Sequence, residues 1–134
     1  MKYLLDTNIC VHLLRGRRDV AEAIDGVGIS ACCISEITQA ELLFGEQLAI
    51  RRGRTPDRAS LRTFLKMMHI IPVSDSLELY ASEKSRLVSD GIPIEDFDLL
   101  IACTAVSAGA VLVTENISHM SRVSGVRLEN WVSR

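Results

Sequence analysis

Short apolar runs that alternate with helical patterns constrain the fold of this chain more than any other feature of its sequence. Four such runs occupy residues 2–5, 29–34, 69–73 and 111–113, and a weaker one occupies residues 126–131. Helical patterns separate them, which favours parallel pairing because parallel strands need long crossover connections. We therefore predict an α/β fold, a three-layer α/β/α sandwich with a central, mainly parallel sheet.

Capping residues and glycines set the limits of the predicted helices. Thr7 is suited to cap the first helix, and Ser35 to cap a long third one. Pro93 fits the first turn of the last long helix. We expect helices to stop at Gly16, Gly26, Gly91 and Gly109. The predicted helices occupy residues 7–14, 19–24, 36–50, 56–68, 75–90 and 93–107, with an exposed loop at residues 51–57 and a short helix after residue 113.

Size and charge exclude several classes of protein. The chain has 134 residues, of which 48% are hydrophobic, and this suits a single domain over residues 1–134. Its formal net charge of −2 gives no general attraction for nucleic acids or anionic membranes, so any RNA contact must come from local patches. Because no stretch reaches the roughly 18–20 consecutive apolar residues that cross a bilayer, we predict no membrane association.

The cysteines indicate a reducing compartment. They lie in apolar runs, without a CxxC spacing or a secretion signal ahead of them, at Cys10, Cys32, Cys33 and Cys103. We therefore expect buried, reduced thiols in a cytoplasmic protein, and no cysteine zinc site.

Polar residues follow two of the predicted strands. Asp6 follows the first strand, and Thr114, Glu115 and Asn116 follow the strand at residues 111–113. Because ligands gather at the carboxyl ends of parallel strands, we expect these two segments to form one site. Asp6 has an alternative interpretation, as part of a helix-capping turn.

Glu41 shares a predicted helix face with apolar residues. At 100° per residue its neighbours on that side are Ile37, Phe44 and Leu48, which predicts that Glu41 faces the core. A buried, ionised carboxylate needs an arginine, hydrogen-bond donors or a cation to compensate its charge. An arginine partner and a slight rotation of the helix are the alternatives.

Asp98 repeats this pattern in the helix that follows Pro93. Its side of the helix also carries Ile94, Ile101, Ala102 and Ala105. The helix is apolar nearly all round, however, so periodicity does not distinguish Asp98 from Asp96. Asp96 has an alternative role in complementing the helix dipole.

Three acids that are distant along the chain, Asp6, Glu41 and Asp98, suit a hard divalent cation. Mg²⁺ and Mn²⁺ fit better than zinc, because oxygen ligands dominate and the histidines are scattered, at His12, His69 and His119. We predict that three supporting residues donate hydrogen bonds to a phosphate or to ligand carboxylates: Thr7, Asn8 and Thr114. Helix capping and turn formation are alternative explanations for these residues.

Arginine-rich loops offer contacts for RNA phosphates, although a solvated face explains them as well. These arginines are Arg15, Arg17, Arg18, Arg51, Arg52, Arg54 and Arg58.

Four sequence blocks resemble those of the PIN-domain ribonucleases, in their order and spacing. They are LLDTNIC at residues 4–10, AELLFG at 40–45, DLLIA at 98–102 and LVTEN at 112–116. The tail SRVSGVRLENW at residues 121–131 is similar to the ending of VapC toxins, so the resemblance spans nearly the whole chain.

The resemblance implies a PIN-like fold and a metal-dependent endoribonuclease, the toxin of a bacterial toxin–antitoxin pair. By this similarity Asp6, Glu41 and Asp98 carry the metal, which favours Asp98 over Asp96. Asn116 stands where the family often has an Asp, and Glu115 is the adjacent carboxylate. The resemblance further implies a homodimer, a VapB-type antitoxin and an RNA substrate, with transfer RNA favoured.

Two other functions compete with this interpretation. A PIN-like module that binds RNA or an antitoxin with little or no nuclease activity is consistent with Asn116 in place of a fourth carboxylate. An aspartate-based phosphotransfer protein is disfavoured, because the segment from Asp6 to Asn8 lacks the paired aspartates of such enzymes.

Overall fold

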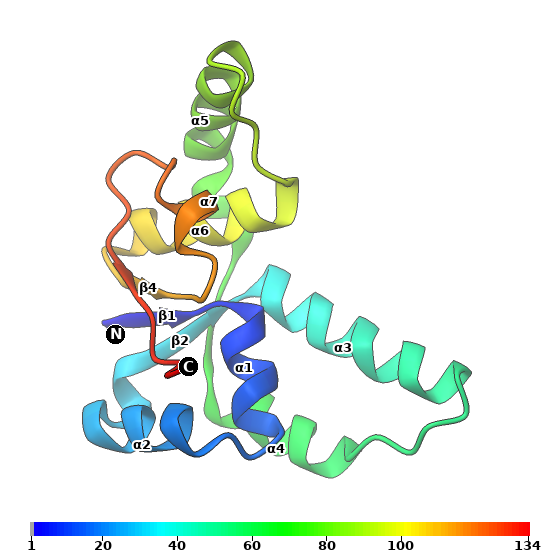
Figure 1. Cartoon of the computed structure of the whole chain (residues 1–134). Helices are drawn as coiled ribbons and strands as arrows, with labels where there is room; N and C mark the ends of the chain where they lie inside the picture. The colour runs from blue at the N-terminus through cyan, green and yellow to red at the C-terminus, as the bar shows by residue number, and fades with distance from the viewer. Residues whose placement is uncertain (1) are drawn as a thin grey trace.

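A sheet of five parallel strands organises the computed structural model, which describes residues 2–134 (Figure 1). The strand order is β3-β2-β1-β4-β5, so the first strand of the chain lies at the centre. All four pairings between neighbours are parallel, which confirms the predicted fold class. The strands are β1 (Tyr3–Leu5), β2 (Cys32–Ser35), β3 (His69–Ile71), β4 (Val111–Val113) and β5 (Leu128–Glu129).

Helices cover both faces of this sheet. Adjacent residues of a strand point to opposite faces, so Leu4 and Leu5 belong to two different core clusters. Helices α5, α6 and α7 pack on the face of Leu4, and helices α1, α2 and α4 on the face of Leu5. The helices are α1 (Thr7–Leu14), α2 (Arg18–Val27), α3 (Glu36–Arg51), α4 (Arg58–Met67), α5 (Leu77–Ser89), α6 (Asp96–Ala108) and α7 (Ile117–Met120).

Several predicted boundaries are wrong. Asp6, not Thr7, caps α1, because its carboxylate accepts a hydrogen bond from the Thr7 N–H. Helix α2 runs past Gly26 and ends at Gly28, whose φ of 86° no other residue type adopts easily. Residues Ile29–Ala31 form a single 3-10 turn before β2. Pro93 precedes α6, and its carbonyl accepts a hydrogen bond from a side chain on another segment, Arg122.

The buried face of α3 also differs from the prediction. Thr38, Leu42 and Glu46 are buried, whereas Phe44 is 65% exposed and Glu41 is half-buried. This helix contacts α1, α4 and α6 but extends beyond the sheet, as Figure 1 shows, so little core exists to orient its apolar residues. The buried carboxylate is therefore Glu46, to which Arg62 donates two hydrogen bonds of 2.9 and 2.7 Å.

The burial of the cysteines and the lengths of the helices agree with what the sequence predicts. All four thiols are free and buried, as predicted. Within residues 2–134, no helix is both long and apolar enough to cross a bilayer.

The buried strand β4, next to the central strand β1, should contribute strongly to stability. Leu112 is fully buried, so Leu112→Ala should lower the free energy of unfolding by about 2–5 kcal/mol through lost burial and a residual cavity. Urea denaturation measures this change. Leu77→Ala is the matched control, since Leu77 is 50% exposed and the same substitution should cost less than about 1 kcal/mol there. Equal losses in the two variants would contradict this assignment of the core.

Candidate active site

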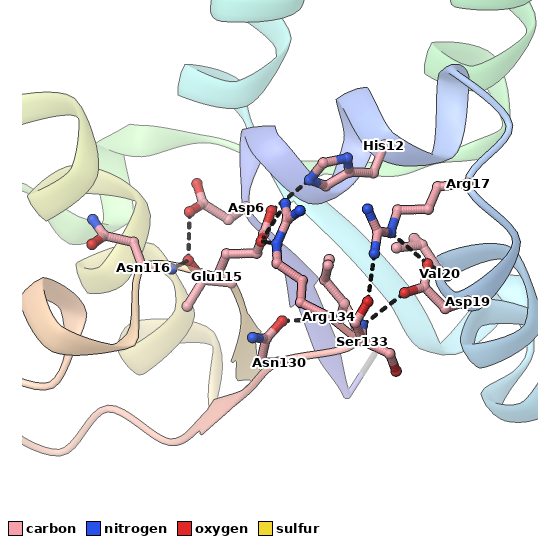
Figure 2. Close-up of polar contacts among 12 residues, drawn as sticks. Asp6, His12, Arg17, Asp19, Val20, Glu115, Asn116, Asn130, Ser133 and Arg134 are labelled. Carbon is pink, nitrogen blue, oxygen red and sulfur yellow. Dashed lines mark hydrogen bonds and ion pairs between the residues drawn. The ribbon is translucent and has the colours of Figure 1, made fainter.

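Asp6 and Thr114 meet at the carboxyl edge of the sheet. The strands that precede them are neighbours in register, with Leu5 opposite Val113. The Asp6 N–H donates to the Val113 carbonyl at 2.9 Å, and the Thr114 hydroxyl donates to Asp6 Oδ2 at 2.8 Å (Figure 2). The other carboxylate oxygen of Asp6 accepts the capping bond from Thr7. Asp6 thus caps a helix and also lies at the predicted edge, so its two interpretations are compatible.

Thr7 links Glu41 to this edge. Its hydroxyl donates to Glu41 Oε1 at 2.6 Å and lies 3.0 Å from the hydroxyl of Thr38, which is fully buried. Glu41 is near enough to Asp6 for its negative charge to contribute to raising the pKa of the Asp6 carboxyl, after the larger effect of burial. Helix α3 therefore delivers a second acid, although from a half-buried position and not from the core face.

Helix α6 delivers the third acid, and the structure distinguishes Asp98 from Asp96. Asp98 is half-buried, and its pKa is raised by burial and then by the charge of Asp6. Asp96 is exposed and accepts hydrogen bonds from Lys84 Nζ at 2.6 Å and from the Tyr80 hydroxyl at 2.7 Å, which lower its pKa. Asp98 is therefore coupled to Asp6, and Asp96 is held in an ion pair.

The acids of this site form no ion pair. Among the ion pairs of residues 2–134, none involves Asp6, Glu41 or Asp98. His119 lies near enough to Asp98 to oppose part of the rise in its pKa, but burial and the charges of Asp6 and Glu95 outweigh it. The two buried glutamates are compensated, Glu46 by Arg62 and Glu83 by Arg86. Because Asp6 is only 4% exposed, its charge lacks both water and a counter-ion from the chain, an arrangement typical of a cation site.

The donor set fits a hydrated divalent cation. In the described part of the chain, no three acidic, histidine or cysteine side chains are close enough together to form a ready-made metal cluster. The acids are instead coupled in pairs, Asp6 with Glu41 and Asp6 with Asp98. Mg²⁺ requires only one or two direct carboxylates and keeps water in its other positions. An open cleft of about 500 Å³, lined in part by Glu41 and Asp98, gives access to these acids.

In the segment after β4, Glu115 is engaged by two basic side chains. Both carboxylate oxygens of Glu115 are taken, one by the His12 ring and the other by Arg134 Nε at 2.9 Å, so Glu115 is not a free acid. The Asn116 N–H donates to Thr114 Oγ1 at 3.0 Å, and its side-chain oxygen lies 2.7 Å from Nδ1 of His119. Asn116 therefore lies beside the acids without joining an ion pair.

Sequence reasoning missed His12, Thr38 and Arg134. Their contacts join segments that are distant along the chain, and no local pattern in the sequence marks them. Asn8 is exposed at the start of α1. Of the predicted cationic loops, Arg17 and Arg58 are engaged in ion pairs, whereas Arg15 and Arg54 line a second cleft of about 420 Å³ that also reaches Glu41.

Comparisons with known proteins agree with this geometry. A family model described as the PIN domain matches residues 3–126. The chain is 34% identical to ribonuclease VapC2 of Rickettsia felis and 28% identical to the tRNA(fMet)-specific endonuclease VapC of Salmonella typhimurium, with 98% of each chain covered. The crystal structure of DNA-bound VapBC from Salmonella typhimurium superimposes with a TM-score of 0.86 at 29% identity, over 98% of this chain and 99% of that one.

Because the charge of Asp98 is uncompensated, we predict that neutralising this residue stabilises the fold. A carboxyl whose pKa is higher in the folded chain than in the unfolded chain destabilises the fold increasingly as pH rises through the folded-state pKa. Asp98→Asn should therefore stabilise the metal-free protein at pH 7, and the gain should shrink as pH falls toward about 4. Denaturant melts in EDTA at several pH values measure this difference.

Asp19→Asn is the control of opposite sign. Hydrogen bonds from Arg17 and Ser133 help to lower the pKa of Asp19 to about 2, so its charge stabilises the fold at neutral pH, and the same substitution should destabilise it there. A loss of stability in both variants at pH 7 would contradict the uncompensated state of Asp98.

Proposed function

The chain belongs to the PIN-domain family and to its VapC ribonucleases, and from that premise we propose that it cleaves RNA with a divalent cation held by Asp6, Glu41 and Asp98. The single observation that carries this proposal is the set of acids at one sheet edge that form no ion pair among residues 2–134. The family relationship supplies the nuclease chemistry, and the uncompensated charge supplies a reason for a cation to bind here.

Each residue of the site has a role in the proposed reaction. A bound Mg²⁺ or Mn²⁺ would supply Lewis acidity, which activates water and offsets charge on the phosphodiester. Thr114 and Thr7 hold the two oxygens of Asp6, and the Thr7 hydroxyl also holds Glu41, so these ligands are oriented before RNA arrives. Asn116 offers an amide for orienting the attacking water or the phosphate. The products would carry a 5′ phosphate and a 3′ hydroxyl.

The substrate and partners follow from the relatives. The Salmonella typhimurium relative is named as a tRNA(fMet)-specific endonuclease, which supports transfer RNA as the substrate class. The structural relatives are VapBC complexes, which supports a VapB-type antitoxin as partner. We further propose that residues 1–134 form one PIN domain that acts as a homodimer and as the toxin of the pair.

A binding module without nuclease activity is the second candidate. The observation that favours it is that no ready-made cluster of three metal-binding side chains occurs in the described chain. Such a module would act through the antitoxin or through RNA alone, and it would not need a cation.

Neutralising one acid of the site should abolish cleavage. We expect Asp98→Asn to reduce the cleavage rate by at least roughly 100-fold, because loss of a partner that only orients a metal ligand already costs 10- to 100-fold. Asp96→Asn is the matched control, two residues away on the same helix and paired with Lys84, and it should cleave like the native chain. The assay uses total RNA with Mg²⁺ or EDTA, with mapped fragment ends. Activity in the Asp98 variant, or its loss in the Asp96 variant alone, would refute the assignment.

Metal titration separates the two candidates without RNA. Calorimetry with Mn²⁺ should show binding to the native chain and to the Asp96 variant, and much weaker binding after Asp6→Asn, because the shared acid of both pairs is then neutral. The absence of any binding by the native chain would favour the module.

A further inference from the structure

Glu115 joins three segments of the chain beside the site. Its Oε1 lies against Nε2 of His12 on α1, and its Oε2 accepts a hydrogen bond of 2.9 Å from Nε of Arg134 (Figure 2). Helix α1 begins directly after Asp6, and Arg134 lies in the segment that follows β5. Because both oxygens are engaged and Arg134 compensates the charge, Glu115 holds these segments together.

The position of Glu115 makes this junction relevant to the proposed chemistry. It lies between Thr114, whose hydroxyl donates to Asp6 Oδ2, and Asn116, whose N–H donates to that same hydroxyl oxygen at 3.0 Å. Thr114 is fully buried, so its hydroxyl cannot exchange this hydrogen bond for one to solvent water. A displacement of the backbone at Glu115 therefore changes the hydrogen bond that orients Asp6.

Two connections thus join α1 to the segment after β4. The Thr114–Asp6 bond lies at the start of α1, and the Glu115–His12 contact lies near its end. The Thr114 N–H also donates to the Glu129 carbonyl at 2.9 Å, so the backbone is held at Thr114, and the Glu115–His12 contact fixes the direction in which the segment continues along the helix. Arg134 donates to the other carboxylate oxygen of Glu115 and so supports the Glu115–His12 contact.

The segment that carries Arg134 is itself docked. Arg17 donates to the Ser133 carbonyl at 2.6 Å, the Ser133 N–H donates to Asp19 at 2.7 Å, and Val132 is buried. Arg134 is therefore presented to Glu115 by a fixed backbone. Because the Arg134 side chain is 64% exposed, its ion pair contributes little to stability, so a contribution to function would lie in orientation.

We propose that Glu115 is a positioning residue of the site, held by His12 and Arg134, which keeps Thr114 and Asn116 in the orientation that Asp6 requires. This inference rests on the proposed function, because it concerns the rate of the same RNA cleavage. The docked segment at residues 130–134 is thereby part of the active site, although it contributes no reacting group.

The test compares Glu115→Ala, Arg134→Ala and the double variant on an RNA with a mapped cleavage site, with Mg²⁺. Each single variant should lower kcat by roughly 5- to 10-fold and leave KM within about twofold, because misplacing a reacting group by a fraction of an ångström slows chemistry. The double variant should be no slower than Glu115→Ala, since the two residues act through one contact. Arg134→Lys should restore part of kcat.

Three controls separate positioning from folding. Arg127→Ala removes an arginine whose side chain donates to the Gly109 carbonyl at 2.7 Å, away from Glu115, and should leave kcat unchanged. Trp131 is the only tryptophan of the chain and packs against Tyr3, so unchanged emission in Arg134→Ala shows that the segment stays docked. Asp98→Asn serves as the inactive reference in the same assay.

The outcomes are distinct. Native kcat in Glu115→Ala and Arg134→Ala, beside an inactive Asp98 variant, would overturn the positioning role and leave the nuclease intact. Fully additive losses, or a lower kcat only where Trp131 emission shifts, would equally overturn it. Cleavage by the Asp98 variant would remove the proposed function itself and this inference with it.

Discussion

The buried charge of Asp6 is the constraint on which the site depends. Asp6 lies between the ends of two adjacent parallel strands, accepts two hydrogen bonds, and still has a raised pKa because burial outweighs them. Elsewhere the fold pairs its buried acids with arginine, at Glu46 and Glu83. At Asp6 it instead tolerates the free-energy cost of a buried carboxylate without such a partner. An uncompensated charge of this kind is what the proposed cation site requires.

Much of the architecture could be predicted from the sequence, because the period of the apolar residues reflects burial directly. The strand at Val111–Val113 and the stop of α6 at Gly109, whose φ is 65°, are examples. Glycine and proline predicted the ends of the helices less reliably. Gly26 was expected to end α2, but that helix continues to Val27. Pro93 was expected in the first turn of α6, but it lies in the loop before that helix, where its carbonyl accepts a hydrogen bond from Arg122.

The extent to which the sequence alone identifies a residue of the candidate site differs from residue to residue. Asp6 followed from topology. Asp98 followed from its apolar neighbours and from the family resemblance, and the structure separates it from Asp96, which is held by Lys84 while Asp98 is affected by the charge of Asp6. Glu41 was selected for a face of α3 that proved to be partly exposed, since a helix that extends beyond its sheet has no single core to orient it. The partners of Glu115 depend on tertiary contacts, which periodicity does not encode.

The order of the strands has a consequence for biosynthesis. The central strand is made first, but its neighbour β4 pairs Val111 with Tyr3, and β5 pairs with β4 in turn. At a translation rate of roughly 5–20 residues per second, Asp6 leaves the ribosome seconds before Thr114 exists. Asp98 and Thr114 are both late additions, so a chain that stops before residue 98 lacks one of the three acids, and a chain that stops before residue 114 lacks the threonine that orients Asp6. A nuclease built in this way would be harmless to the translation machinery that produces it until the β4 segment has been made.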